Sequence, residues 1–159
     1  PISIKGVTVR SGPNPQKDPG NDFLSWKPTA WARDDVYEMA GVSNPREEIG
    51  LAQVHDCFSL TELLTYEDLD FCDRGAAKEH IADGTFERTG ALPVNTDGGL
   101  KAFGHPTGAT GVRMIYENVL QLRGLAGERQ IPNLDGKLAL SHNIGGHPTA
   151  CGIAILGRP

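Results

Sequence analysis

Hydrophobic and polar positions along the chain alternate between two periods, one typical of strands and one typical of helices. Apolar runs of strand length occur at 2–10, 49–54, 137–140 and 152–156. Apolar residues at helical spacing predict helices over 29–40, from Ser59 onward, over 74–82 and over 107–123. Strands that alternate with helices predict an α/β domain, and a length of 159 residues suits one such domain over residues 1–159.

Individual residues predict where these helices begin and which faces they bury. Thr29 is the expected N-cap of the first helix, and Ser59 with Glu62 forms the Ser-x-x-Glu pattern of a capping box. Trp31 is expected in the core. The helix over 107–123 is expected to direct an apolar stripe toward the core. This stripe consists of Val112, Ile115, Tyr116, Val119 and Leu122.

Residues 11–28 interrupt the pattern of elements. They include Pro13, Pro15, Pro19 and Pro28, together with glycines and asparagines. This composition predicts a long loop. Long loops in compact domains are often functional or line an interface.

Composition excludes several functional classes. A net charge of −5 with scattered Lys and Arg argues against binding nucleic acid through its phosphates. Because the chain has neither an apolar run of about 18 residues nor a secretory leader, we expect no membrane span and no secretion. Three cysteines without close spacing favour a reducing compartment, the cytoplasm. The chain starts without Met and directly with strand-like alternation, so we expect a piece of a longer protein.

Three segments carry glycine, histidine and cysteine next to predicted elements. They are His55-Asp56-Cys57-Phe58 after the strand over 49–54, Gly104-His105-Pro106 before the last long helix, and His142-Asn143-Ile144-Gly145-Gly146 after the strand over 137–140. Loops at the carboxyl ends of strands in open α/β sheets usually build the functional site. We therefore expect these three loops to converge at one edge of the sheet.

Each segment also has a structural interpretation by itself. A Gly-His-Pro histidine can cap a turn, a buried cysteine is often a small hydrophobe, and a lone histidine is often a core residue.

Taken together, the three segments would place a thiol beside imidazoles, which suits acid–base chemistry near neutral pH. Backbone N–H groups of Gly145 and Gly146 would suit an oxyanion hole. Zinc ligation by the same histidines and Cys57 lacks the short-spaced pairs of zinc motifs, so we predict no metal.

The glycine-rich stretch from Gly98 to Arg113 resembles a family signature. With Asn95 in register, it is similar to the Asn-x-x-Gly-Gly…Gly-His-Pro-x-Gly-Ala-Thr-Gly-x-Arg motif of thiolases, and the resemblance to their C-terminal half covers nearly the whole chain. His-Asp-Cys-Phe at 55–58 and His-Asn-x-Gly at 142–145 resemble the sterol-carrier type of thiolase. The resemblance implies a thiolase-like C-terminal domain, with a mixed, mostly parallel five-stranded sheet and helices on both faces.

The resemblance also implies an acyltransferase reaction of lipid metabolism, as in β-oxidation. A thiolase cleaves a 3-oxoacyl-CoA with coenzyme A, or runs the reverse Claisen condensation. Coenzyme A and acyl-CoA are then substrates, and no cofactor is bound permanently. His105 would activate the nucleophilic cysteine and hold the thioester oxygen. His55 would position a water or the same oxygen, and Cys57 would move the α-proton.

Further residues receive roles by the same resemblance. Asn143 and Gly145 would belong to the oxyanion hole and substrate-binding region, and Phe58 would contact the pantetheine arm. The nucleophilic cysteine of the family lies in its N-terminal half, and neither Cys72 nor Cys151 matches that motif. We therefore expect the chain alone to be inactive.

The missing nucleophile implies partners. We expect an N-terminal thiolase half, in the same longer chain or as a separate subunit, and a dimer or higher oligomer. A small partner with an OB-fold and a zinc motif accompanies some bacterial thiolases. The cytoplasm is the expected compartment, or the peroxisome in a eukaryote.

Two alternatives to a thiolase stay open. A thiolase-like aldolase would cleave a β-hydroxyacyl-CoA side chain without a nucleophilic cysteine, together with the same kind of OB-fold partner. A non-catalytic acyl-CoA-binding subunit would keep only the fold. The presence of Cys57 and His105 favours the thiolase.

Overall fold

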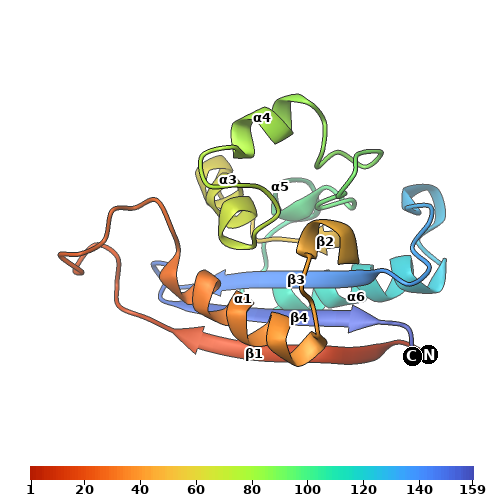
Figure 1. Ribbon diagram of the computed structural model, residues 1–159, viewed down its shortest axis with the longest axis horizontal. Coiled ribbons are helices and arrows are strands. Elements are labelled where there is room, and N and C mark those ends of the chain that lie inside the picture. The colour runs from red at the N-terminus through yellow and green to blue at the C-terminus, as the bar shows by residue number, and fades with distance from the viewer.

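The computed structural model describes residues 1–159 and contains a mixed sheet of four strands in the order β1-β4-β3-β2 (Figure 1). The strands are β1 (Ser3–Ser11), β2 (Ile49–Gln53), β3 (Leu138–Gly145) and β4 (Ala150–Gly157). β2 pairs with β3 in parallel, whereas β4 is antiparallel to both of its neighbours. Three strands therefore run in one direction and β4 runs in the other, so the carboxyl ends of β1, β2 and β3 lie at the same edge.

The expected number of five strands is wrong, because the sheet has four. The segment that approaches the free edge of β2 makes only an isolated parallel bridge, between Val94 and Ala52. Pro93 has no N–H to donate to a ladder, and Asn95 turns the chain with a φ of 50°. No regular fifth strand therefore forms beside β2.

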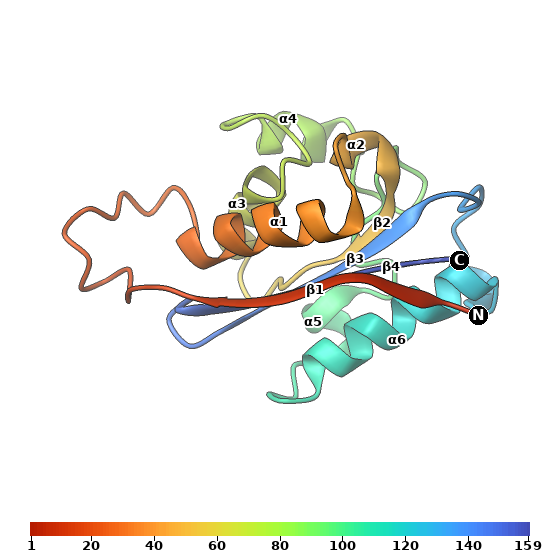
Figure 2. The ribbon, with the colours of Figure 1, turned by 60° about the horizontal axis from the view of Figure 1, so that its bottom comes forward.

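Helices cover both faces of the sheet, as expected. α1 (Lys27–Ala40) packs over β1 and β4 on one face, and α6 (Thr110–Arg123) packs mainly over β3 and β2 on the other (Figure 2). The shorter elements are α2 (Pro45–Glu48), α3 (Ser59–Asp68), α4 (Ala77–Ala82), α5 (Gly99–Phe103) and a 3-10 turn at Gly127–Arg129. No helix is both long enough and apolar enough to cross a membrane.

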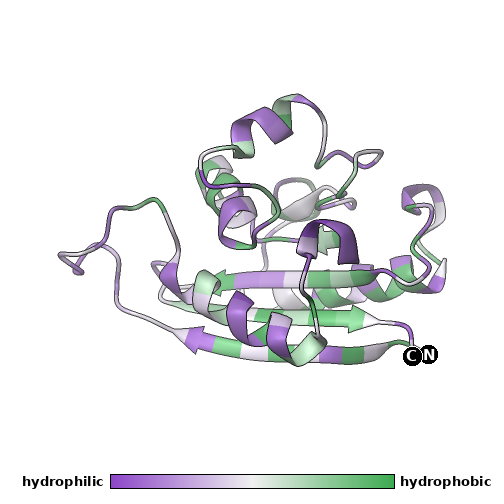
Figure 3. Ribbon diagram, in the orientation of Figure 1, coloured by the Kyte–Doolittle hydropathy of each residue, from purple (hydrophilic) through white to green (hydrophobic).

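Two buried clusters form the core, one on each side of the sheet. The larger lies between the sheet, α1 and α3, and includes Val36, Tyr66, Leu140 and Ile153. The smaller lies under α6 and consists of Leu51, Leu122, Ile131, Leu134, Ala139 and Leu156. Figure 3 shows that β4 is hydrophobic along most of its length, whereas β1 alternates. This difference follows from their positions, because β4 lies inside the sheet and β1 lies at its edge.

Neither predicted helix cap forms. α1 begins at Lys27, so Thr29 lies inside the helix, where its Oγ1 is 3.0 Å from His142 Nε2. α3 begins at Ser59, and Phe58 stands at its N-cap position without a side-chain hydrogen bond. Glu62 accepts a hydrogen bond from Tyr66 instead of capping the helix. Thr29 and Glu62 therefore bond to other side chains, His142 and Tyr66, rather than to backbone N–H groups at the start of their helices.

The predicted apolar stripe of α6 is largely exposed, so its assignment to the core is wrong. Val112 is 70% exposed, Tyr116 is 61% exposed and Ile115 is 40% exposed, whereas Leu122 is buried. The side of α6 that faces the sheet carries mainly polar residues that find partners. Asn118, for example, donates to the carbonyl of Leu140 at 2.8 Å. Hydrogen bonds of this kind allow polar groups to be buried, although Asn118 Oδ1 itself has no partner. Trp31 is also half-exposed rather than in the core.

The predicted loop over 11–28 begins with the last residue of β1 and ends in the first turn of α1. Figure 1 shows it extending from the sheet at the edge where β1 and β3 end. Asp68, buried at the end of α3, accepts hydrogen bonds from Ser25 Oγ at 2.8 Å and from the N–H of Trp26 at 2.7 Å. Arg74 donates to the same carboxylate. These bonds attach the returning end of the loop to the domain.

Candidate functional site

The carboxyl end of β2 brings together three of the residues expected at the site. The rings of His55 and His105 are perpendicular, with centroids 5.0 Å apart. His55 Nδ1 lies 2.6 Å from Asn143 Oδ1. Asn143 lies in β3 rather than in a loop, because β3 continues to Gly145 and pairs with β4 over that length. The expected loop position of His142 and Asn143 is therefore wrong, but the expected convergence occurs.

Gly99 explains how the loop that contains His55 docks on the glycine-rich stretch. Gly99 has a φ of 64°, and a Cβ there would overlap the carboxylate of Asp56, whose Cγ would be only 2.8 Å away. Asp56 Oδ1 accepts the N–H of Leu100 at 2.9 Å, in the first turn of α5. The absence of a side chain at Gly99 therefore lets this carboxylate reach the backbone.

Other residues of the signature hold the turn before His105. Asn95 Oδ1 accepts the N–H of Val54 at 2.9 Å, which extends the bonding of β2 beyond its last residue. Asp97 accepts the N–H of Gly99 at 3.1 Å and also forms an ion pair with Arg113. The Arg113 guanidinium lies 5.2 Å from the ring centre of Phe103. These contacts connect β2, the turn and α6.

The first turn of α6 holds the ring of His105. Its Nδ1 lies 2.8 Å from Thr110 Oγ1, and that hydroxyl lies 3.3 Å from the carbonyl of Pro106. This contact orients the ring through Nδ1 and leaves Nε2 without a hydrogen-bond partner in the protein.

His55 is buried, with 5% of its surface exposed. Burial lowers the pKa of His55, and the nearby His105 lowers it further, whereas the hydrogen bond to Asn143 and the charge of Asp56 oppose this shift. Burial disfavours the charged imidazolium, so His55 is neutral at neutral pH. The site thus contains two adjacent imidazoles, of which His55 stays uncharged.

The other three residues expected at the site, Cys57, Phe58 and Gly145, are exposed. The Sγ of Cys57 lies 3.8 Å from Thr61 Oγ1. Phe58 is 73% exposed. Gly145 ends β3 opposite Ala150. No hydrogen bond joins these three residues to His55 or His105, so of the expected residues only His55, His105 and Asn143 are in contact.

The other two cysteines are buried away from solvent. Burial raises the pKa of the Cys72 thiol to about 11 and that of the Cys151 thiol to about 12. Both are free thiols. A buried thiol with a raised pKa is a poor nucleophile, because the thiolate is the reactive form. No group of three or more His, Cys, Asp or Glu side chains is arranged to hold a metal ion.

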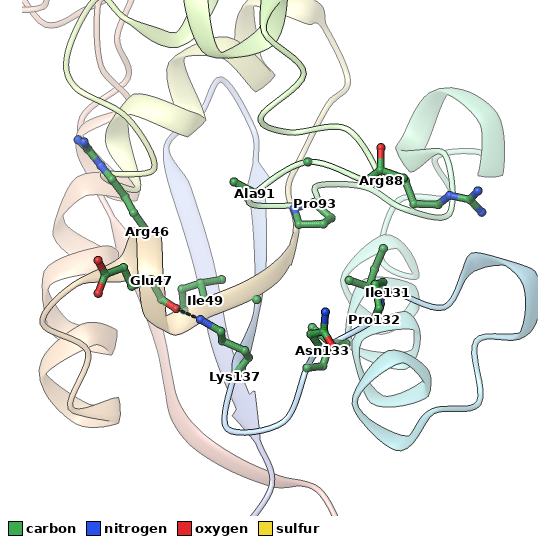
Figure 4. Close-up of a pocket in the computed structure, with 14 residues that line it drawn as sticks. Arg46, Glu47, Ile49, Arg88, Ala91, Pro93, Ile131, Pro132, Asn133 and Lys137 are labelled. Carbon is green, nitrogen blue, oxygen red and sulfur yellow. Dashed lines mark hydrogen bonds between the residues drawn. The ribbon is translucent and has the colours of Figure 1, made fainter.

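A pocket of about 370 Å³ lies at the opposite end of β2 (Figure 4). Two of the three basic residues that line it donate hydrogen bonds to backbone carbonyls of the protein, and the third points away. Lys137 donates to the carbonyl of Glu47, Arg88 donates to the carbonyl of Glu128 at 2.7 Å, and the side chain of Arg46 points away from the pocket. This pocket lies apart from the paired imidazoles.

Sequence reasoning assigned no role to Asp56, and it placed His142 among the converging histidines without predicting that its ring is buried. The available signal for Asp56 was the Gly98-Gly99 pair, because adjacent glycines permit the close approach of another group. For His142 the sequence carried no such signal, because its contacts with Thr29 and His55 join residues far apart in the chain.

Residues 19–158 match the family described as "Thiolase C-terminal domain-like". The chain belongs to this family. The thiolase-like domain is 37% identical over 158 residues to an acetyl-CoA acetyltransferase of Methanothermobacter thermautotrophicus, covering 99% of this chain and 40% of that protein. It is 43% identical over 109 residues to human sterol carrier protein 2, covering 69% of this chain and 19% of that protein. The expected membership in the thiolase family is confirmed.

Further relatives differ in their named activities. The benzoylsuccinyl-CoA thiolase subunit BbsB of Thauera aromatica is 32% identical over 149 residues, which cover 92% of the thiolase-like domain and 37% of BbsB. The solved Ltp2-ChsH2(DUF35) aldolase is 31% identical with a TM-score of 0.80, and 99% of the domain covers 39% of that chain. The domain therefore spans at most about 40% of the length of these relatives.

A monomeric SCP2-thiolase-like protein of Mycobacterium smegmatis shares the fold. It has a TM-score of 0.70 and 14% identity, over 99% of the thiolase-like domain and 29% of that chain. The thiolase-like α/β fold expected from the sequence is confirmed, with four strands in place of five.

Proposed function

We propose that this chain is the C-terminal part of an acyl-CoA thiolase, which cleaves a 3-oxoacyl-CoA with coenzyme A or catalyses the reverse Claisen condensation. The observation that carries the proposal is the perpendicular pair of His55 and His105, 5.0 Å apart, on segments that belong to the matched family. Cys57 follows His55 by two residues, so an acid–base thiol lies on the same loop.

The two histidines and Cys57 divide the proton transfers between them. His105 Nε2 accepts the proton of a nucleophilic thiol supplied by the rest of the thiolase, and the thiolate attacks the 3-oxo carbon of the substrate. The bond between C2 and C3 breaks, and the acetyl-CoA carbanion takes a proton from the thiol of Cys57. Coenzyme A then gives its thiol proton to the Cys57 thiolate and attacks the acyl-enzyme. The nucleophilic cysteine leaves as its thiolate and takes back the proton that His105 holds at Nε2. A thiol can serve in both directions when its pKa lies near the ambient pH.

The substrate is held by the groups around this pair. The N–H of Gly145 contributes to an oxyanion hole for the acyl-enzyme, and Phe58 contacts the pantetheine arm. The exposure of Phe58 supports this assignment, because a large apolar side chain in solvent is available to a ligand. Coenzyme A and acyl-CoA act as substrates, and no permanent cofactor takes part.

An exposed apolar surface supports docking of the N-terminal half of a thiolase. The surface, termed the α6–β1 face, consists of Val112, Ile115 and Tyr116 of α6 with Ile4, Val7 and Val9 of β1, all at least 40% exposed. A groove of about 330 Å³ lies within it and also contacts Asn143. Contiguous exposed apolar surface marks interaction sites. A partner on this face would lie next to the site and bring the nucleophile.

The assembly contains at least these two halves, and we propose a dimer or higher oligomer of the whole. The naming of BbsB as a subunit and of the aldolase as a complex with a DUF35 component supports a multi-subunit state. A small OB-fold and zinc-motif partner fits the same comparison. Two buried free thiols support a reducing location, the cytoplasm.

The test uses the intact protein with acetoacetyl-CoA and longer 3-oxoacyl-CoAs. Cys57→Ala should lower kcat by about 10²–10⁴-fold, the range of a lost general acid–base. Cys72→Ala is the matched control, because Cys72 is buried away from the site and should leave kcat near that of the wild type. Wild-type protein that neither forms an acyl-enzyme nor cleaves thioesters would contradict the proposal. Unchanged turnover in Cys57→Ala would remove only the acid–base role of Cys57.

Similarity to the Ltp2-ChsH2(DUF35) aldolase favours a second candidate, a retro-aldol cleavage of a β-hydroxyacyl-CoA side chain. Such a cleavage consumes no coenzyme A and forms no acyl-enzyme. Product formation from a β-hydroxyacyl-CoA without added coenzyme A would establish the aldolase. Acyl-enzyme formation with a 3-oxoacyl-CoA would establish the thiolase.

A further inference from the structure

One guanidinium contacts three segments that lead to the two histidines of the site. Arg113 lies in the first turn of α6, and only 9% of its side chain is exposed. Its Nη1 donates to Gln53 Oε1 at 3.2 Å and to the carboxylate of Asp97. The ring of Phe103 lies against the same guanidinium, with 5.2 Å between the arginine Cζ and the ring centre. Arg113 therefore joins β2, the turn after Val94 and α5 to the start of α6.

Each of these contacts lies close in the chain to a histidine of the site. Gln53 is the last residue of β2, two residues before His55. Phe103 is the last residue of α5, two residues before His105. Asp97 accepts the N–H of the first residue of α5 at 3.1 Å, so it holds the start of the helix that leads to His105. A single side chain is thus attached to both segments that carry an imidazole.

The rings themselves do not define their spacing. The ring of His55 contacts Asn143 of β3 at 2.6 Å, whereas the ring of His105 contacts Thr110 of α6 at 2.8 Å. No hydrogen bond joins the two rings, whose centroids are 5.0 Å apart. Asp56 attaches the chain after His55 to the backbone of α5. The spacing of the rings therefore also depends on how the chain before each of them is attached.

The ion pair between Arg113 and Asp97 is buried, since the two side chains are 9% and 1% exposed. Removal of one partner leaves the other charge buried and unpaired, which costs about 3–5 kcal/mol. Replacement of a whole buried pair by apolar groups often costs little stability, and the best-attested use of such pairs is to set the register of packed segments. The position of this pair between β2, α5 and α6 fits that use.

We propose that Arg113 is a positioning residue, which holds the segments that carry His55 and His105 at the spacing that brings their rings together. The consequence for catalysis rests on the proposed thiolase function, in which both histidines act on one substrate. A displacement of a reacting group by about 1 Å can cost about 10²-fold in rate. Because the guanidinium is buried among its contacts, its loss should affect the reaction and leave substrate binding nearly unchanged.

The direct test measures the ring pair in the intact protein labelled with ¹³C-histidine. A nuclear Overhauser effect between the ring C–H protons of His55 and His105 reports their distance without any turnover. The wild type should show this effect, and Arg113→Met, which keeps an unbranched apolar side chain without the guanidinium, should lose it. Arg129→Met is the matched control. Arg129 also pairs with a buried carboxylate of α6, Glu117, but donates to neither segment that leads to the histidines, so the effect should persist.

Kinetics separate positioning from a loss of stability alone. Arg113→Met should lower kcat by about 10²-fold and change KM by less than about threefold. Arg113→Lys should restore part of kcat, because its ammonium still donates to Asp97 but lacks the planar guanidinium. Arg129→Met should keep kcat near that of the wild type although it removes a buried ion pair.

A variant on the other side of the ion pair covers the case in which Arg113→Met does not fold. Asp97→Asn keeps an oxygen for the N–H of Gly99 but removes the negative charge that pairs with Arg113. It should lose the effect between the rings and lower kcat in the same way. Combined with Arg113→Lys, it should lower kcat no further than the larger single effect, because both substitutions act on one contact.

Three results would overturn the proposal. They are a wild type without the effect between the rings, an effect that persists in Arg113→Met or Asp97→Asn, and a loss of kcat in Arg129→Met as large as that in Arg113→Met. The spectra do not depend on catalysis. If the ring contact depends on Arg113 while the wild type cleaves no thioester, the positioning role stands and the proposed thiolase function fails. If thioesters are cleaved and Arg113→Met keeps its kcat, the thiolase function stands and the positioning role fails.

Discussion

Replacement of Gly99 by alanine tests how the His55 loop is attached to the glycine-rich stretch. The variant adds a Cβ at a φ of 64°, which is strained by roughly 1–2 kcal/mol for an L-residue. The new Cβ would also overlap the carboxylate of Asp56, with Cγ 2.8 Å away. Asp56 must then release the N–H of Leu100, a hydrogen bond to a charged group that is worth about 1.5–3 kcal/mol. Gly99→Ala should therefore lower the free energy of unfolding by about 3–4 kcal/mol.

Gly124→Ala provides the matched control. Gly124 ends α6 with a φ of 72°, and a Cβ there would have no neighbour within 4 Å. It should cost only the conformational strain of roughly 1–2 kcal/mol. Urea unfolding of the intact protein, followed by circular dichroism, measures both variants. The difference between them, about 2 kcal/mol, isolates the contact with Asp56.

A double-mutant cycle with Asp56→Ala completes the test. Once the carboxylate is gone, the alanine at position 99 has nothing to displace, so the double variant should be about 2 kcal/mol more stable than the sum of the single effects predicts. The reasoning is refuted if Gly99→Ala costs no more than Gly124→Ala. It is also refuted if the effects of Gly99→Ala and Asp56→Ala add within about 0.5 kcal/mol.

Three other predictions concern the buried histidine, the exposed apolar face and the long loop. In the folded protein His142 has a pKa of about 3 and is neutral, whereas in the unfolded chain it binds a proton below about pH 6.5. The free energy of unfolding should therefore fall from pH 7 toward pH 3, and urea titrations should show a smaller fall in His142→Asn. An equal dependence of the free energy of unfolding on pH in the two proteins would contradict this. If the N-terminal half covers the α6–β1 face, Ile115→Lys should destabilise the intact protein by about 1.5–3 kcal/mol more than Ile81→Lys, whose side chain is similarly exposed outside this face. Equal destabilisation by the two variants would argue against docking on the α6–β1 face. Asp68→Ala should lower the free energy of unfolding by about 2–3 kcal/mol and speed proteolysis within residues 12–26. Asp73→Ala, at an exposed carboxylate, should change neither quantity. Equal cleavage rates in the two variants would show that Asp68 does not attach the loop.

The positions of most elements were predictable because they depend on local sequence. The strand over 49–54 corresponds to β2 (Ile49–Gln53), and the helix over 29–40 corresponds to α1 (Lys27–Ala40). The loop over 11–28 is where four prolines predict it. The approach of His55 to His105 was also expected, because loops at one edge of an α/β sheet converge. His105 reaches this edge through the segment around Val94, which forms only an isolated bridge with β2.

The partners of individual side chains were not predictable from local pattern. Ser59 and Glu62 match a capping box, but Glu62 has stronger partners in Tyr66 and Asn95. Thr29 lies inside α1 and bonds to His142, more than a hundred residues away in the chain. Such bonds form only after the sheet has brought the segments together.

The family signature, the order of the predicted strands and helices, and the segments that meet at the site can be read from the chain. Which face of α6 is buried and where Asn143 points depend on contacts between segments far apart in the chain. Hydrophobic periodicity identifies an apolar face without saying what covers it, and α6 places Asn118 rather than Val112 against the sheet because the sheet offers hydrogen-bond partners there. The site likewise depends on Asn143 being the last polar residue of β3, a register that pairing with β4 sets.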